Sequence, residues 1–225
     1  MLRIARTGAV EARTAAFNQL KDLLVTAPDA LRDRWRGKTL HRVGLEAARL
    51  RPDADQAADP STATRLALRS IGQRILALNE EIAGLDKQLA DLVARTAPTT
   101  IALTGVGTET AAQLLLTAGA NIERLHNEAA FAALCAASPI PASSGKTNRH
   151  RLNPAGDREA NKALYIIAIV RMRYCPKTKA YVERRQAEGL TKKEAIRALK
   201  RYIARDLYHA IRADLTQPLG PLDDL

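Results

Sequence analysis

The segment from Ser138 to Lys162 concentrates the side chains of this chain that could do chemistry. It places two adjacent serines and a glycine among cations, just ahead of an apolar stretch. Ser143 and Ser144 offer hydroxyl groups as nucleophiles, and Gly145 lets another backbone approach closely. The positive field that a phosphate group needs would come from Lys146, Arg149, His150, Arg151, Arg158 and Lys162. The segment therefore favours a site that handles phosphate.

Two motifs that the segment lacks narrow its chemistry. A nucleotide-binding phosphate loop requires a glycine where this chain has Ile140. A hydrolase nucleophile elbow requires glycine on both sides of the serine, which neither Ser143 nor Ser144 has. Attack of a serine oxygen on a phosphodiester fits better, because the cations could stabilise the charge that develops on the phosphate oxygens. His150 could act as the base or contact a phosphate, and both roles stay open.

The charge of the chain indicates an anionic partner. The 225 residues carry a net charge of +11, with 46% apolar residues that can form a core. Residues 146–225 hold 18 basic and 9 acidic side chains, whereas residues 98–145 hold 1 and 3. This clustering favours DNA or another nucleic acid as the partner, and a merely basic surface is the alternative.

The cysteines, the acidic residues and the apolar runs exclude several other classes of protein. Cys135 and Cys175 lack the spacing of a zinc site or a disulfide framework, which fits a reducing cytoplasm. Asp157 and Glu159 are too few for a two-metal carboxylate site, so we expect no metal or other cofactor in this chain. The longest apolar run, 163–170, is far shorter than the roughly 20 residues of a membrane span. We therefore expect a cytoplasmic protein without a membrane partner.

Apolar periodicity predicts a mainly α protein. Helical patterns cover Ala9–Val25, a second piece around Leu31–Leu50, and Asp157–Tyr174, with a turn-rich loop at Pro52–Ser61. A capping box at Thr191–Glu194 opens a last helix. The residues of its apolar face are Ile196, Leu199, Ile203, Leu207 and Ile211. The opposite face is basic and could follow a phosphate backbone through Lys193, Arg197, Lys200, Arg201 and Arg205.

The most regular pattern in the chain is a heptad seam, formed by Leu68, Ile71, Ile75, Leu78, Ile82, Leu85, Leu89 and Leu92. Such a stripe predicts a long coiled-coil stem, because it buries itself against another helix. That helix could belong to a second copy of the chain, giving a homo-oligomer, or to the same chain. We expect the homo-oligomer.

Two glycines open a further helical stripe at Thr104–Leu116. Gly105 and Gly107 precede Ala111, Leu114 and Leu115, a pattern that resembles a helix-hairpin-helix. In that unit, backbone N–H groups at the start of a helix bind a DNA phosphate. An ordinary glycine turn between packed helices is the alternative.

These elements predict three regions. Residues 1–97 would form a helical arm and the coiled-coil stem. Residues 98–215 would form a compact helical C-terminal domain that contains the helix-hairpin-helix-like element. Residues 216–225, with two prolines and two aspartates, would form a tail.

Long stretches of the chain resemble the C-terminal part of the insertion-sequence one-ten (one-ten/one-sixteen/nine-oh-two) family of transposases. The resemblance rests on SPIPASSGKTNRHRLNPAGDREANKAL, IVRMRY and AYVERRQAEGLTKKEAIRALKRYIARDLY. ALTGVGTETAAQLL resembles the opening of the family's C-terminal domain, and ARTAAFNQLKDLLVTAP the stretch before its coiled coil. Nearly the whole chain is covered.

The resemblance implies a DNA recombinase in which a serine joins covalently to DNA. Carried over to this chain, that serine is Ser144, with Ser143 as the fallback, and Lys146, Arg149 and Arg151 would hold the phosphate. The resemblance also implies oligomers, a guide (bridge) RNA, and magnesium held by carboxylates of an N-terminal resolvase-like domain.

The chain departs from the family pattern because residues 1–60 show no trace of that resolvase-like domain. We therefore expect a truncated or remnant transposase; an internal start codon or a separately encoded N-terminal part would also explain the pattern. The sequence thus predicts a DNA-binding transposase with a serine nucleophile. The alternative is a catalytically inert remnant that binds nucleic acid and oligomerises.

Overall fold

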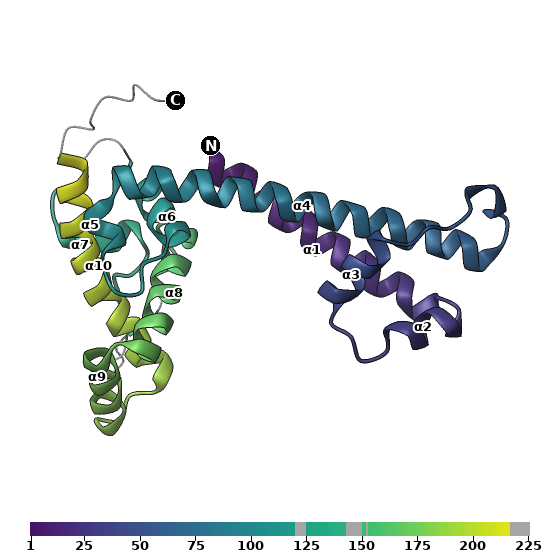
Figure 1. Cartoon of the computed structure of the whole chain (residues 1–225). Helices are drawn as coiled ribbons and strands as arrows, with labels where there is room; N and C mark the ends of the chain where they lie inside the picture. Colours follow the sequence, from purple (N-terminus) through teal and green to yellow (C-terminus); the bar gives the residue numbers. More distant parts are fainter. Residues whose placement is uncertain (120–124, 143–149, 152, 217–225) are drawn as a thin grey trace. The chain divides into compact units, whose positions relative to one another are not determined.

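The computed structural model describes residues 1–119, 125–142, 150–151 and 153–216, which are mainly helical (Figure 1). This confirms the predicted mainly α class. The elements in chain order are α1 (Leu2–Thr26), α2 (Asp29–Trp35), α3 (Leu40–Ala48), the 3-10 turn η1 (Ala54–Gln56), α4 (Pro60–Thr96), α5 (Pro98–Ile101), α6 (Thr108–Ala118), α7 (Glu128–Leu134), β1 (Ile140–Pro141), β2 (His150–Arg151), α8 (Arg158–Tyr174), α9 (Pro176–Ala187) and α10 (Lys192–Thr216).

The chain divides into two compact units, residues 1–88 and residues 89–225. The domain boundary expected from the sequence, between residues 97 and 98, lies nine residues further along, between the end of α4 and the start of α5, and stays a prediction. Apart from Thr216, the expected tail lies outside the described residues. Within the described ranges, no helix combines the length and the apolarity that crossing a membrane requires.

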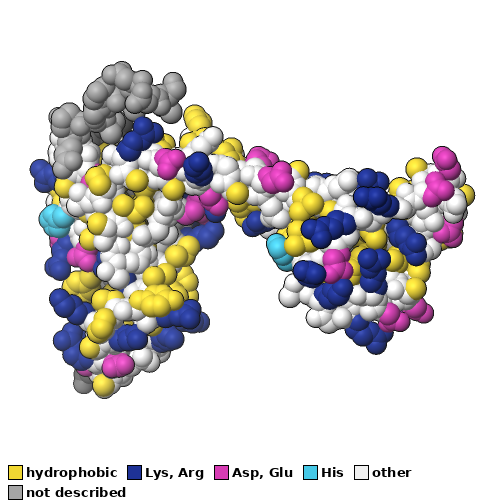
Figure 2. All heavy atoms as spheres, viewed as in Figure 1, with side chains coloured by type: hydrophobic (Ala, Val, Ile, Leu, Met, Phe, Trp, Pro, Cys, Tyr) yellow, Lys and Arg dark blue, Asp and Glu magenta, His cyan; other side chains and the backbone are white. Residues whose placement is uncertain are grey.

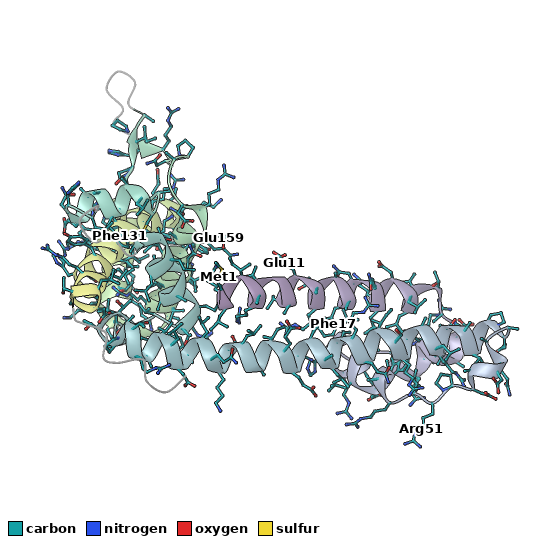
Figure 3. The ribbon with its side chains drawn as sticks, turned by 90° about the horizontal axis from the view of Figure 1, so that it is seen from above. Met1, Glu11, Phe17, Arg51, Phe131 and Glu159 are labelled. Atoms are coloured by element: carbon teal, nitrogen blue, oxygen red, sulfur yellow. The ribbon has the colours of Figure 1, made fainter. Side chains whose placement is uncertain are left out.

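In the first unit, α1 runs antiparallel to α4. Arg6 pairs with Asp86, Arg13 donates to Asn79 at 3.0 Å, and Arg74 donates to Gln19 at 3.0 Å, so the partners step in opposite directions along the two helices. Figure 3 shows the two helices side by side, with Phe17 of α1 between them.

The heptad seam has a partner inside the chain. Leu68 and Ile75 are buried in one apolar cluster with Leu20 of α1 and Val43 of α3, and Ile82 is also buried. Leu92 at the end of the seam is 36% exposed, and Val93 is buried in its place. A second copy is thus not needed to cover the first turns of the seam, and the coiled-coil oligomer stays a prediction.

Gly72 lets α3 and α4 pack backbone to backbone. A Cβ atom at Gly72 would lie 2.5 Å from the amide nitrogen of Ala48 and 2.8 Å from the carbonyl oxygen of Gly44. Trp35 is buried nearby in the same cluster and donates its indole N–H to Glu46 at 3.0 Å. Hydrogen bonds from Lys38 and Arg42 lower the pKa of Glu46 to about 2.

The second unit is organised around α10, which contacts α5, α7, α8 and α9. The apolar face that the sequence predicted for this helix is buried, with Ile203, Leu207 and Ile211 fully covered. Near its end, the buried carboxylate of Asp214 accepts hydrogen bonds from the backbone N–H groups of Thr99 and Thr100 at 2.9 and 2.8 Å. This carboxylate fastens the first turn of α5 to α10.

Local sequence signals located some boundaries and missed others. The capping box is confirmed, because Thr191 and Glu194 exchange side-chain and backbone hydrogen bonds. The single helical piece expected around Leu31–Leu50 is wrong: α2 and α3 are separate, and Gly37 between them has a φ of +75°. Helices α7 and α9 were not predicted, since both are short and α9 has few apolar residues.

Gly72→Ala tests the close packing of α3 on α4. Because the new methyl group would overlap backbone atoms, we expect a loss of about 1–3 kcal/mol in the free energy of unfolding. Urea unfolding followed by the fluorescence of Trp35, the sole tryptophan, measures it. The matched control is Gly84→Ala in the same helix, where nothing lies within 4 Å and alanine should stabilise by up to about 1 kcal/mol. Equal effects of the two substitutions would contradict the packing argument.

Candidate functional site

A short strand pair frames the segment that carries the two candidate serines. Strands β1 and β2 are antiparallel, with Ile140 opposite Arg151 and Pro141 opposite His150. Ser143, Ser144, Lys146 and Arg149 belong to the connection between the strands and lie outside the described residues. The chemistry that the sequence assigns to these four residues therefore stays a prediction.

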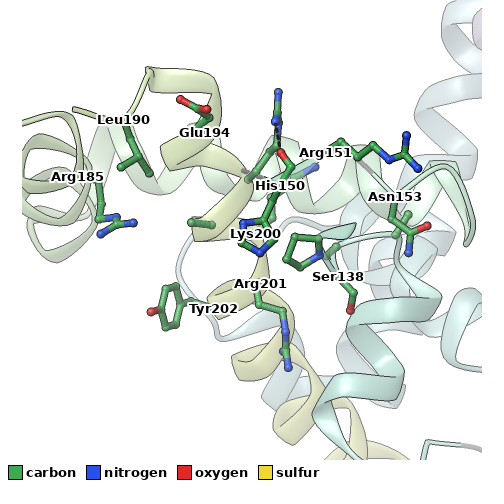
Figure 4. A pocket seen from close by; sticks show the side chains of 15 residues that line it. Ser138, His150, Arg151, Asn153, Arg185, Leu190, Glu194, Lys200, Arg201 and Tyr202 are labelled. Carbon is green, nitrogen blue, oxygen red and sulfur yellow. Dashed lines mark hydrogen bonds between the residues drawn. The ribbon is translucent and has the colours of Figure 1, made fainter. Parts of the chain in front are cut away.

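A cleft of about 540 Å³ lies beside the strand pair (Figure 4). Its walls come from the turn at residues 136–139, from β2, from the end of α9 and from α10. Among the described residues that line it, five are lysine or arginine and one is a carboxylate, Glu194. The cleft is therefore electropositive, which suits an anionic ligand. Its basic side chains are Arg151, Arg185, Arg197, Lys200 and Arg201.

Helix α10 brings its cations to the strand pair. Arg197 donates to the backbone carbonyl of His150 at 3.5 Å, a long hydrogen bond between α10 and β2 (Figure 4). Arg201, one turn further along, lies 3.8 Å from Glu128 of α7 and also borders the cleft. The apolar face of α10 is buried, and of the opposite, basic face Arg197, Lys200 and Arg201 line the cleft, whereas Lys193 and Arg205 do not.

Lys200 differs from the other cations because it is only 6% exposed. Its ammonium group donates to the side-chain oxygen of Asn161 on α8 at 2.7 Å. Asn161 in turn donates to the backbone carbonyls of Cys135 and Ala136 at 3.1 and 2.8 Å. Lys200 thus holds, through Asn161, the turn that leads into β1.

That turn is strained and closely packed. Ala136 has a φ of +51°, which a residue with a Cβ rarely adopts, so the surrounding contacts must hold it there. Gly156, at φ +94°, lies against the turn: a Cβ atom there would be 2.7 Å from the carbonyl oxygens of Ala133 and Leu134. Side chain and backbone together fix the entry to the strand pair.

Asp157 caps the N-terminus of α8. Its carboxylate accepts hydrogen bonds from the backbone N–H groups of Glu159 and Ala160, at the start of α8, and from Thr117 of α6 at 2.5 Å. Burial opposes its ionisation, but these hydrogen bonds outweigh burial and lower its pKa. In the described parts of the chain, no group of three or more His, Cys, Asp or Glu side chains could hold a metal ion.

The remaining predicted site residues lie away from the cleft lining. Arg158 and Lys162 are exposed on the first turns of α8, and Lys162 pairs with Glu159 at 3.6 Å. Gly105 packs against α8, where a Cβ atom would lie 3.0 Å from Arg171 Cγ. The N–H of Gly107 donates to Thr110 at 3.0 Å. These contacts fit a glycine turn between packed helices, and phosphate binding there stays a prediction.

The sequence of the second unit has relatives among insertion-element proteins. Residues 101–183 match the transposase IS116/IS110/IS902 family. The predicted resemblance to the C-terminal part of this transposase family is confirmed. The match includes both candidate serines, the strand pair and Asn161, whereas the cations of α10 follow it along the chain.

Two curated proteins are similar over longer stretches. The insertion element IS900 uncharacterized 42 kDa protein of Mycobacterium paratuberculosis is 28% identical over 91% of this chain, which covers 57% of that relative. The insertion element IS110 uncharacterized 43.6 kDa protein of Streptomyces coelicolor is 27% identical over 68% of this chain and 38% of its own length. The chain thus spans about half the length of these two relatives, or less.

Three residues of the site escaped the sequence analysis. Nothing in the sequence marked Asn161 as a site residue, because an asparagine within a helical pattern is expected to lie on the surface. Arg185 lies in α9, which was not predicted. Tyr202 had a recognisable signal, since it is an aromatic residue interleaved in the basic run Lys200–Arg205.

Asn161→Ala tests the support of the turn at 135–137. It removes the acceptor of a nearly buried ammonium group and the donor of two carbonyls, so we expect a loss of about 2–4 kcal/mol in the free energy of unfolding. Urea unfolding followed by circular dichroism measures it. Lys162→Ala, the next position of α8, removes an exposed ion pair and should change stability by less than about 0.5 kcal/mol. If Asn161→Ala lowers the free energy of unfolding no more than this control does, Asn161 does not stabilise the turn.

Lys200 should also leave a signature in the pH dependence of stability. Burial, and then the charge of Arg197, lower its pKa below the ordinary 10.5. Between the lowered pKa and 10.5 the unfolded chain binds more protons at this site, so stability rises with pH over that interval. The difference in unfolding free energy, wild type minus Lys200→Met, should therefore increase from neutral pH to pH 10.5. A flat difference would show that Lys200 titrates normally.

Proposed function

We propose that this chain is part of an insertion-element transposase that binds DNA and attacks it with Ser144, or with its neighbour Ser143. One observation carries the proposal: cations from β2, α9 and α10 line one cleft beside the strand pair whose connection contains both serines. The similarity of residues 101–183 to a transposase family supports DNA as the ligand of this cleft.

The proposed step is a transesterification at phosphorus. The serine oxygen loses its proton and bonds to the phosphorus of a phosphodiester, while the bond from phosphorus to one sugar oxygen breaks. That sugar oxygen takes up a proton and leaves as a hydroxyl group, so the DNA strand is opened and the protein carries a phosphoserine ester. Attack by a hydroxyl group of a second DNA end reverses the chemistry and joins the two strands.

The cleft residues would act on charge and position. Arg151, Arg197 and Arg201 would neutralise the phosphate oxygens, which gain charge as the serine attacks. Lys200, through Asn161, would hold the turn before β1 in place. His150 borders the same cleft and suits either proton transfer or a phosphate contact. A guide RNA and a homo-oligomer, which the resemblance implies, belong to this proposal as partners.

Arg197→Ala tests the cleft as the DNA site. We expect DNA binding to weaken about 5- to 10-fold, because one charged contact is lost, and the dependence of log affinity on log salt to become shallower by about one unit. Fluorescence anisotropy with a labelled duplex at several salt concentrations measures both. The control is Lys179→Ala, an exposed lysine of α9 outside the cleft lining, which should leave the salt slope nearly unchanged. If the affinity of the wild-type chain for DNA does not change with salt concentration, the proposal is contradicted.

The covalent step has its own test. The purified chain is mixed with element-end DNA, alone and together with the IS900 42 kDa relative, and denatured samples are examined for a protein-DNA adduct. We expect an adduct that Ser144→Ala abolishes and Ser143→Ala leaves, or the reverse if Ser143 is the nucleophile. An adduct formed only with the relative indicates a composite site. DNA binding without any adduct of this chain indicates the alternative, an inert nucleic-acid-binding remnant.

A further inference from the structure

Tyr202 places an exposed aromatic ring on the wall of the cationic cleft. It follows Arg201 on α10, is 49% exposed and lines the same cleft as Arg151 and Arg197. Tyr181 of α9 meets it edge to face, with ring centroids 5.6 Å apart and an interplanar angle of 75°. Figure 4 shows Tyr202 and Arg185 approaching the cleft from two different helices.

Core packing accounts for another tyrosine of α10 but leaves Tyr202 unexplained. Tyr208 is 4% exposed and donates its hydroxyl to the carbonyl of Leu125 at 3.2 Å. Tyr202, in contrast, keeps half of its surface accessible among arginines, and the guanidinium carbon of Arg205 lies 5.6 Å from its ring centroid. Figure 2 shows the same mixture around α9, where dark blue cationic side chains surround yellow hydrophobic ones.

An aromatic ring inside a basic groove is the arrangement that binds unpaired nucleotides. The cations hold the phosphates, and a base stacks on the ring whatever its identity. In a duplex the bases are stacked on one another, so the ring can reach only a base that has left its pair. A cleft of about 540 Å³ falls in the size range of sites that take small molecules, so it has room for one or a few nucleotides.

We propose that Tyr202 is a stacking platform for an unpaired nucleobase, and that the cleft takes a single-stranded stretch of nucleic acid whose phosphates contact Arg151, Arg197 and Arg201. This inference rests on the proposed function and narrows its ligand from DNA in general to unpaired nucleotides. The strand could be deoxyribose or ribose, because stacking and phosphate contacts are common to both.

The test compares four ligands of equal length: an oligothymidylate, the same strand with abasic sites, an oligouridylate and a duplex. Affinities are measured for the full chain and its variants by anisotropy at one salt concentration. Tyr202→Ala should weaken oligothymidylate binding about 5- to 150-fold and duplex binding less than about 2-fold. Tyr202→Phe keeps the aromatic ring and should bind as the wild type does. With the abasic strand, Tyr202→Ala should cause no further loss.

The matched control is Tyr174→Ala. Tyr174 is 64% exposed and also has an arginine over its ring, with Arg173 at 5.3 Å, but it does not line the cleft. Its loss should leave all four affinities unchanged. Comparison of the oligothymidylate with the oligouridylate shows which sugar the cleft prefers.

The outcomes separate this inference from the proposed function. If the wild-type chain binds none of the four ligands, the proposed function itself fails. If it binds them but Tyr202→Ala behaves like Tyr174→Ala, the stacking platform alone is overturned. A loss on the abasic strand as large as on the oligothymidylate would also overturn it, since the effect would then not involve a base.

Discussion

A single nearly buried hydrogen bond, from the ammonium group of Lys200 to the side-chain oxygen of Asn161, connects the parts of the second unit on which the cleft depends. Taking a lysine out of water is costly, and the bond to Asn161 offsets part of that cost. Through Asn161 the same contact reaches the carbonyl groups of Cys135 and Ala136, and so the strained turn before β1. One polar contact thereby relates α10, α8 and the strand pair.

The hydrogen bond between Lys200 and Asn161 explains why Lys200 has a different role from the other cations of α10. The apolar face of this helix is buried by neighbouring helices, and three cations of its basic face, Arg197, Lys200 and Arg201, line the cleft. Arg197 is exposed and Arg201 is half-buried, so both can meet an anion, whereas Lys200 is buried and its ammonium group binds Asn161. Tyr202 adds an apolar surface between charges. The cleft thus combines electrostatic attraction with a flat ring, two contacts that nucleic acid can use at once.

The periodicity of apolar residues predicted the long helices better than the short ones. The apolar stripe of α10, its capping box and the helix beginning after Asp157 follow from spacing alone, because a helix must bury one face and satisfy its first N–H groups. Helices α7 and α9 escaped, since a short helix owes its stability to tertiary contacts rather than to its own sequence. The heptad seam shows a further limit of prediction from sequence. Its spacing predicted that a second helix packs against it but did not identify that helix, and α1 of the same chain is one such partner.

By itself the sequence determined the helical class, the basic character of the last third, the likeness to a transposase family and the residue types available for phosphate chemistry, because these are properties of composition and local order. Only the tertiary structure decided that Arg151 and Arg197, 46 positions apart, border one cleft, that Lys200 is buried, and that Arg158 and Lys162 lie elsewhere. The physical reason is that a cation's role depends on its distance from other groups and from water, and those distances arise when helices distant along the chain pack against each other.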